Sequence, residues 1–281
     1  MLKKQLALIL IVISYVSINY GEDFYYKKVK LDGKYKIVGR YQINREKAKK
    51  TSCYDFIYNE TGKLIKVQYL ENGNLNIDPY FGCAIITIEY SEGYETHIFK
   101  DVNGKPMKNE KGVYSIRLKL DKNGNPILLQ NLDNNGKLME DIDGVSQYKW
   151  ILDNKGRRII SFRLNKQGEQ ITDKNGVYEI SWKYNDKDEI IESWHYGTNG
   201  QLVEDKNGIT IIRWKYDNSG NIIEISYYGI NGKLKNRKDW GIAKIIWEYN
   251  KTGKLKIAKF FGENGQPQKH NLWDSNVMFF K

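Results

Sequence analysis

The sequence predicts an all-β fold of tandem, glycine-punctuated antiparallel β-hairpins that form an elongated, twisted sheet or solenoid-like array. The chain has 21 Tyr and 7 Trp beside 4 Pro, and aromatic residues favour strands. Glycines recur at 32-residue intervals, which indicates an internal repeat: Gly112, Gly144, Gly176 and Gly208. Within a unit, apolar and polar residues alternate between turns rich in Asp, Asn and Gly, as is typical of β-hairpins.

The segment "EDKNGITIIRWKYDNSGN", residues 204 to 221, shows the pattern of one unit. Its Asp, Asn and Gly residues are those that tight turns require, because Asp and Asn hydrogen-bond their own backbone and Gly adopts positive φ without strain. With residues 217–220 as the loop, we expect Trp214 to pair with Ile223 and Arg213 with Glu224. Apolar and charged residues then lie on opposite faces of the hairpin.

The repeat divides the chain from residue 22 onward into three parts. About six hairpin units cover residues 50–268. Residues 22–49 fit the pattern poorly and are expected to form a divergent amino-terminal cap, while residues 269–281 form a carboxy-terminal cap or tail. Repeat arrays need such atypical ends, because an unmodified end would continue the stacking.

Residues 1–21 match a secretory signal peptide. Lys3 and Lys4 precede an apolar run from Leu6 to Ile18, which as a helix would span about 20 Å of a bilayer core roughly 30 Å thick. An uncleaved anchor is the alternative. No later apolar stretch approaches the length of a membrane span, so we expect a mature chain without a transmembrane helix that is extracellular, at the cell surface or periplasmic.

Cys53 and Cys83 are the only cysteines, and an even number in an exported chain suggests one disulfide. The bridge is feasible if one strand separates the two residues. If each unit adds a full hairpin to a flat sheet, the cysteines lie about 10 Å apart and remain free thiols. No CxxC pair is present, and we expect no metal or cofactor.

The repeated Asp and Asn residues of the turns invite comparison with calcium-binding loops. An EF-hand loop requires ligands at fixed offsets and a bidentate Glu at its end, and no unit supplies that set. We interpret these residues as turn formers, with weak calcium binding as the alternative.

A tryptophan recurs at one position of the repeat, forming a column of Trp150, Trp182, Trp214 and Trp247. Its place on the apolar face of the hairpin favours packing in the core. Since aromatic faces also stack on sugars and bases, a ligand-binding platform is the alternative.

Basic residues recur on the opposite face and form a candidate anion-binding stripe of Arg117, Lys119, Lys149, Lys183, Arg213 and Lys215. The formal charge of +11 also favours anionic partners in general. A solvated face that prevents pairing with other chains explains the same residues.

The turn and strand pattern Tyr216-Asp217-x-x-Gly220-Asn221, followed by an apolar strand and "GINGKL", resembles the YD repeats of RHS-type bacterial surface and secreted proteins. Tyr184-Asn185 and Tyr249-Asn250 depart from it. The resemblance covers most of the mature chain and implies a β-strand repeat architecture outside the cytoplasm. RHS proteins build long β shells, and about six units are too few to enclose cargo.

These features predict an exported, non-catalytic repeat protein that acts as a binding, adhesion or scaffold element. Its expected partner is a protein of unknown identity or an anionic glycan or surface polymer. The alternatives are a glycan- or cell-wall-binding module that uses the repeated aromatic residues, or an accessory subunit of an enzyme. His97, His195 and His270 are single residues without spaced partners, and the chain contains no recognisable catalytic or specific nucleic-acid motif.

Export is the first testable prediction. The native protein should lack the apolar run of Leu6 to Ile18, because signal peptides are removed during secretion. Mass spectrometry of the protein from culture medium and cell fractions measures this directly. An intact Met1 on a cytoplasmic protein would contradict every expectation of an extracellular location.

Overall fold

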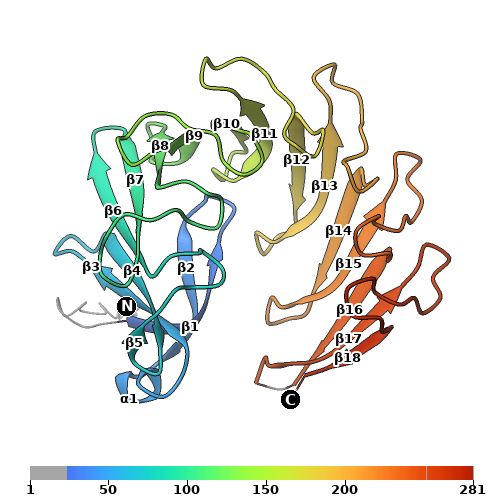
Figure 1. The fold of residues 1–281 in the computed structure, drawn as a ribbon, viewed down its shortest axis with the longest axis horizontal. Helices are drawn as coiled ribbons and strands as arrows, with labels where there is room; N and C mark the ends of the chain where they lie inside the picture. Colours follow the sequence, from blue (N-terminus) through green and yellow to red (C-terminus); the bar gives the residue numbers. More distant parts are fainter. Residues whose placement is uncertain (1–23, 251, 281) are drawn as a thin grey trace, which may run out of the picture.

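The computed structural model describes residues 24–250 and 252–280. Within these residues the chain forms one antiparallel sheet of 18 strands that bends into an open arc (Figure 1). This arrangement confirms the all-β class and the elongated, twisted array of hairpins. The predicted signal peptide, residues 1–21, lies outside the described residues.

The elements follow one another with short connections. The first are β1 (Phe24–Leu31), β2 (Ile37–Ile43), α1 (Arg45–Ala48), β3 (Cys53–Tyr58), β4 (Leu64–Glu71), β5 (Asn74–Leu75), β6 (Ile85–Ser91) and β7 (Tyr94–Lys100). The middle strands are β8 (Ser115–Leu120), β9 (Pro126–Leu132), β10 (Gln147–Leu152), β11 (Arg158–Leu164), β12 (Glu179–Tyr184) and β13 (Ile190–Tyr196). The last are β14 (Ile211–Tyr216), β15 (Ile222–Tyr228), β16 (Lys244–Tyr249), β17 (Leu255–Phe261) and β18 (Val277–Phe279). In this part of the chain, no helix has the length and apolar character needed to cross a bilayer.

The order of strands in the sheet follows the order of the repeats. β1 lies between β2 and β3, and from β3 each hairpin pairs with the next along the chain until β18. The short β5 pairs only with the end of β4. Each repeat therefore buries its apolar residues chiefly against its neighbours, as in other repeat proteins.

The glycine-rich segments form turns, as the sequence predicts. In the β14–β15 turn, Oδ1 of Asp217 accepts hydrogen bonds from the backbone N–H groups of Ser219 and Asn221, both at 2.9 Å, and Gly220 has a φ of 76°. Asp188 takes the equivalent glycine position in the β12–β13 turn with a φ of 61°, a conformation that Asp tolerates. Among the described residues, no group of three or more His, Cys, Asp or Glu is placed to hold a metal ion.

The strand register is shifted from the one predicted. The observed pairs are Trp214 with Ile225 and Lys215 with Glu224, whereas the predicted pairs were Trp214 with Ile223 and Arg213 with Glu224. The turn is longer than assumed, and a β-bulge beside it adds one further residue. Away from the bulge the shift is by two residues, so it leaves those side chains on their predicted faces; beside the turn, Tyr216 pairs with Ile222, one residue from its predicted partner.

The turns that precede successive hairpins are joined by backbone hydrogen bonds, which we call the turn ladder. At equivalent repeat positions an N–H group of one turn donates to a carbonyl of the turn before it. The pairs are Glu110 to Phe81 at 3.0 Å, Ile142 to Lys111 at 3.0 Å, Lys174 to Asp143 at 2.9 Å, Lys206 to Asn175 at 2.9 Å, Lys238 to Asn207 at 3.1 Å and Asn271 to Trp240 at 2.9 Å. The ladder holds neighbouring units at a fixed spacing along one edge of the array.

A tyrosine at the end of the first strand links the hairpins at the opposite edge. The hydroxyl of Tyr184 donates to the carbonyl of Arg158 at 2.7 Å, and the hydroxyl of Tyr216 donates to that of Ile190 at 2.7 Å. Tyr249 repeats the contact. This contact gives the tyrosine of the Tyr-Asp pattern a structural role, because its ring packs between adjacent hairpins while its hydroxyl satisfies a strand carbonyl.

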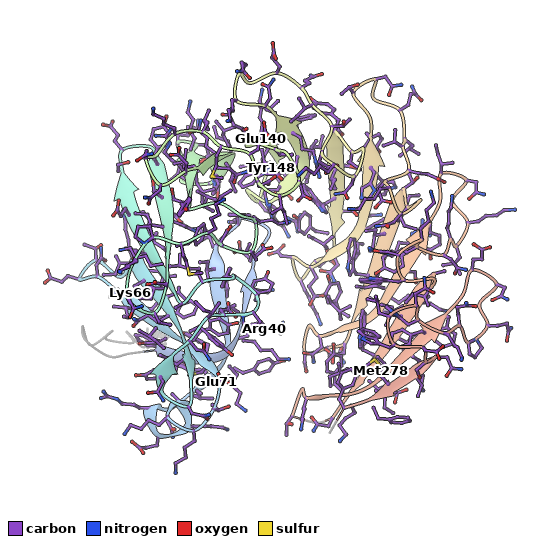
Figure 2. All side chains as sticks on the ribbon, in the orientation of Figure 1. Arg40, Lys66, Glu71, Glu140, Tyr148 and Met278 are labelled. Atoms are coloured by element: carbon purple, nitrogen blue, oxygen red, sulfur yellow. The ribbon has the colours of Figure 1, made fainter. Side chains whose placement is uncertain are left out.

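The β1–β2 hairpin contacts repeats that are far away in sequence. Arg40 lies on the side of β2 that faces the later hairpins (Figure 2), and its Nη2 donates to the carbonyl of Ser219 at 2.5 Å. At the tip of the hairpin, the carbonyl of Gly33 accepts a hydrogen bond from the backbone N–H of Arg158 at 2.9 Å. The N-terminal hairpin thus bridges the arc from its first strands to the turns of its second half.

The candidate disulfide between Cys53 and Cys83 is not formed. Both residues are buried free thiols. Cys53 begins β3, Cys83 lies just before β6, and β4 lies between these strands. Two strand spacings amount to about 10 Å, beyond the Cα separation that a disulfide allows. A single intervening strand, the arrangement expected to permit the bridge, already separates the two residues too far, so that expectation is wrong.

The turn ladder leads to a prediction about two glycines. Gly82 and Gly104 have φ values of 70° and 76°. A Cβ on Gly82 would lie 2.5 Å from the backbone N of Glu110, whereas a Cβ on Gly104 would meet nothing within 4 Å. We expect Gly104→Ala to cost about 1 kcal/mol for its backbone strain, and Gly82→Ala to cost about 1 to 3 kcal/mol more.

Chemical denaturation followed by circular dichroism measures both free energies of unfolding. Gly104→Ala is the matched control, since it imposes the same backbone strain without touching the next turn. Equal losses in the two variants would show that contacts between turns contribute little to stability.

Candidate functional site

The inner face of the arc encloses a cavity of about 580 Å³, within the range of small-molecule sites. Its wall consists of inward-facing residues from β6 to β14, and we call this side of the sheet the inner face. The β1–β2 hairpin contributes Leu31, Tyr35 and Ile37. Loops that belong to the turn ladder complete the cavity and bring acidic residues to it: Glu110, Asp141, Asp143, Asp173 and Asp205.

One repeat position supplies three buried polar residues to the wall. Asn131, Arg163 and His195 lie 32 residues apart, and in the flanking units the same position holds Phe99 and Tyr227. The sequence contains this signal, but strand alternation alone does not distinguish a polar residue facing inward from one facing solvent. The middle repeats therefore differ from the outer ones in having a polar inner wall.

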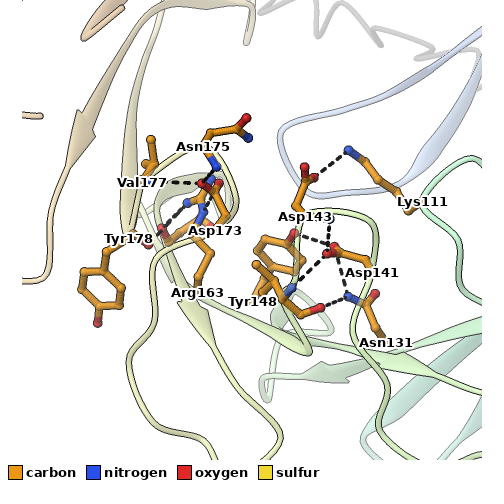
Figure 3. A network of polar contacts seen from close by, with 12 residues as sticks. Lys111, Asn131, Asp141, Asp143, Tyr148, Arg163, Asp173, Asn175, Val177 and Tyr178 are labelled. Carbon is orange, nitrogen blue, oxygen red and sulfur yellow. Dashed lines mark hydrogen bonds and ion pairs between the residues drawn. The ribbon is translucent and has the colours of Figure 1, made fainter. Parts of the chain in front are cut away.

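Asp141 is the centre of the first polar network (Figure 3). Its Oδ2 accepts hydrogen bonds from Nδ2 of Asn131 at 3.3 Å and from the hydroxyl of Tyr148 at 2.6 Å. Its Oδ1 accepts the backbone N–H groups of Asp143 and Val145 at 3.0 Å each. Burial and the neighbouring Asp141 carboxylate raise the pKa of Tyr148 far above its ordinary value, so the phenol remains a donor.

Asp173 repeats the arrangement one unit later with a charged partner. Nε of Arg163 lies 3.1 Å from Oδ2 of Asp173, and both side chains are buried (Figure 3). Oδ1 of Asp173 accepts the backbone N–H groups of Asn175 and Val177. A buried ion pair of this kind is stable only because its remaining polar atoms also have partners.

His195 occupies the third of these positions. Its Nδ1 lies 3.0 Å from the carbonyl oxygen of Ile209, so in the neutral ring Nδ1 carries the proton and donates it. Burial lowers the pKa of His195 below its ordinary value. The nearby Asp205 directs its own Oδ1 to the N–H groups of Asn207 and Ile209, as in the preceding units.

Arg158 is the second arginine of the cavity wall. Its guanidinium lies 4.8 Å from the ring centres of Tyr35 and Trp150 and 5.6 Å from that of Trp182. Its Nε donates to the carbonyl of Gly33 at 3.4 Å. An aromatic cluster thus surrounds a charged group at the place where the β1–β2 hairpin meets β11.

The predicted tryptophan column divides into two parts. Trp150 is buried, with Nε1 donating to Oγ of Ser161 at 3.1 Å, and it lines the cavity together with half-buried Trp182. Trp214 and Trp247 are also half-buried and are not among the cavity residues; Trp247 packs against an apolar cluster of the last hairpins.

The candidate anion-binding stripe lies on the outer face, and several of its charges have partners. Arg213 pairs with Glu192 at 2.8 Å, and Lys215 pairs with Glu224 at 3.0 Å. Arg117 donates from Nε and Nη2 to Oε1 of Gln130. Within the described residues Lys119, Lys149 and Lys183 form no ion pair, so three lysines remain as an unneutralised row.

The cavity combines aromatic faces with polar groups whose positions are fixed by the turns. Each carboxylate of Asp141, Asp173 and Asp205 is oriented by two backbone N–H groups. Burial raises the pKa of Glu110 at the rim. Such preorganised groups suit recognition of a ligand with both apolar surface and hydroxyl groups.

Comparisons with known proteins place the chain in no family. No protein-family model and no curated protein matches it. A porin-like protein from Bacteroides uniformis is similar in structure, with 10% identity, a TM-score of 0.35, and coverage of 77% of this chain and 85% of that one. A TcdB2-TccC3-TEV structure has 12% identity and a TM-score of 0.23 and covers 80% of this chain, which spans 12% of its length. The TcdB2-TccC3 complex is of the RHS type, but so weak a likeness establishes no shared family or function.

The buried His195 predicts a pH-dependent contribution to stability. Since burial lowers its pKa in the folded state, the contribution is complete above the unfolded pKa of about 6.5 and is lost as the pH falls below it. Arg163 opposes protonation, while Asp173 and Asp205 favour it. We expect the unfolding free energy of the wild type, relative to His195→Gln, to decrease by up to about 1.4 kcal/mol per pH unit below pH 6.5.

Denaturant titrations of both proteins between about pH 7.5 and 5.5 measure this difference. The other histidines and the carboxylates titrate in both proteins and cancel. A difference that stays constant with pH would show that His195 has the same pKa in the folded and unfolded chain.

Proposed function

We propose that this protein is an exported, non-catalytic binding protein whose ligand is a small glycan held in the cavity of the inner face. The observation that carries the proposal is the cavity itself, about 580 Å³ in volume, where aromatic side chains alternate with fixed polar groups. Sugars present apolar ring faces and polar edges, and such a wall complements both. The apolar run from Leu6 to Ile18 near the amino terminus supports export.

The aromatic residues at the cavity support a sugar ligand. Tyr80 lines the cavity with 51% of its surface exposed, and its ring packs edge-on against Phe81 with centres 4.8 Å apart. Tyr35 and Trp182 line the same cavity and are half-buried. An exposed ring held in place by a second ring is a preorganised stacking surface.

Several side-chain roles support binding rather than catalysis. Asp141 and Asp173 are bound by their own turns and by Asn131, Tyr148 and Arg163. Proton transfer or nucleophilic attack by these carboxylates would require these hydrogen bonds to break. The groups are better suited to holding a ligand in one orientation.

Adhesion of an anionic surface polymer to the outer face is the second candidate function. The row of Lys119, Lys149 and Lys183 favours it. Glu192 and Glu224 oppose it, because they neutralise two of the six basic residues of the stripe. Exposed lysines of a solvated face attract many anions weakly and select none of them.

Titration calorimetry of the protein from residue 22 onward tests the proposal. The probes are neutral cello- and chito-oligosaccharides and soluble fragments of bacterial cell wall. We expect at least one of them to bind at one site per chain, and Tyr80→Leu to weaken that binding about tenfold, since stacking on an aromatic ring contributes on the order of 1 to 3 kcal/mol.

Trp273→Leu is the matched control, because Trp273 is 50% exposed and lies in the carboxy-terminal tail outside the cavity. It should leave binding unchanged. Binding that is lost in Lys149→Met and retained in Tyr80→Leu would assign recognition to the outer face. The absence of binding by every probe would overturn the glycan proposal.

A further inference from the structure

Arg158 is a half-buried cation without an anionic partner among the described residues. Within the described residues no carboxylate lies within ion-pair distance of its guanidinium, and the weak Nε contact to the Gly33 carbonyl is its one side-chain hydrogen bond. The neighbouring arginines differ. Arg157 pairs with Asp153 at 2.6 Å and with Asp188 at 2.7 Å, and Arg163 pairs with Asp173.

The charge is held in place by aromatic rings. Tyr35, Trp150 and Trp182 lie within 5.6 Å of the guanidinium, and cation–π attraction fixes its plane without using its N–H groups. Both Nη groups therefore keep their donors. Arginine presents these donors as a fork that matches a carboxylate, phosphate or sulfate.

The acidic side chain that acts electrostatically on Arg158 is engaged in its own turn. Asp32 contributes to the electrostatic environment of Arg158, but its Oδ1 accepts the backbone N–H groups of Lys34 at 2.9 Å and Lys36 at 2.8 Å. It closes its own β1–β2 turn. The guanidinium is thus left to face the cavity that it lines.

The cavity has charge of opposite sign on different walls. Asp141, Asp173 and Asp205 come from the turn ladder, whereas Arg158 lies where β11 meets the β1–β2 hairpin. On the turn-ladder side Arg163 neutralises Asp173, and Lys111 neutralises Asp143. Asp205 forms no ion pair among the described residues, and its turn uses only Oδ1. An anionic group beside Asp205 would meet like charge, while a hydroxyl group there can donate to its carboxylate. The two walls together define an orientation for one ligand.

We propose that the ligand carries one carboxylate, phosphate or sulfate group and that Arg158 binds this group through its Nη donors. The proposal rests on the proposed function and narrows its ligand class to an acidic sugar. The sugar hydroxyls then face the acidic wall.

Calorimetric titration with D-glucuronate, D-glucose 6-phosphate and D-glucose tests this inference, because the three probes share a ring and differ in charge. We expect at least one charged probe to bind the wild type about tenfold or more tightly than D-glucose, as charge-assisted hydrogen bonds predict. The two charged probes separate a carboxylate from a phosphate ligand. Arg158→Met should bind the charged probe no more tightly than D-glucose, and its affinity for D-glucose should be unchanged.

Lys149→Met is the matched control. It removes a positive charge from an exposed position on the outer face of β10. This variant should still bind the charged probe more tightly than D-glucose, as the wild type does. Should Arg158→Met fail to fold, Arg158→Lys is the substitute, because it retains the charge but loses the paired Nη donors. We expect it to reduce the ratio of the affinities for the charged probe and D-glucose at least threefold.

Two results would overturn the inference. One is equal affinity of the wild type for charged and neutral probes, or no binding of the charged probes at all. The other is an Arg158→Met variant, or Arg158→Lys in its place, that still binds the charged probe more tightly than D-glucose by the same factor as the wild type. Arg158 would then only hold the β1–β2 hairpin in place. Binding of neutral oligosaccharides with either result would leave the proposed function standing.

Discussion

The turn ladder is the constraint on which the rest of the structure depends. In four successive units the side chain of Asn109, Asp141, Asp173 or Asp205 closes a turn by accepting two backbone N–H groups. The closed turn then exposes a carbonyl to the next turn, as with Asp143 and Lys174. Both sets of bonds satisfy backbone groups that strands cannot reach. Because the bonds recur at one repeat position, they fix the spacing of the hairpins, and the tyrosine hydrogen bonds join adjacent hairpins at the opposite edge.

The same side chains that build the ladder also supply the polar wall of the cavity. A carboxylate has two oxygens, and the turn uses only Oδ1. In the middle units Oδ2 is left for an inward-facing residue, which is how Asp141 meets Asn131 and Asp173 meets Arg163. In the flanking units Phe99 and Tyr227 take the inward position. The polar site is thus confined to the middle of the array.

The β1–β2 hairpin turns a curved sheet into an enclosed site. An open sheet alone would leave the inner face in water, and its aromatic residues would be exposed. Tyr35, near the tip of this hairpin, packs on Trp150 with ring centres 5.0 Å apart. The contacts of Gly33 with Arg158 and of Arg40 with Ser219 join segments more than 120 residues apart. These contacts place the unpaired guanidinium in a surrounding of low polarity, where its attraction for an anion is strongest.

The sequence by itself determined the hairpins, their order and the faces of their strands, because turn chemistry and alternation are local properties that recur in every unit. It therefore predicted the turns around Gly220 and placed the basic stripe opposite the tryptophans. It missed the strand register, since a β-bulge depends on the fit between two strands. It also missed the inward Asn131, Arg163 and His195. Only the tertiary structure decided the free state of Cys53 and Cys83 and the cavity around Arg158, because both depend on how far apart hairpins lie and on where a distant hairpin returns to the sheet.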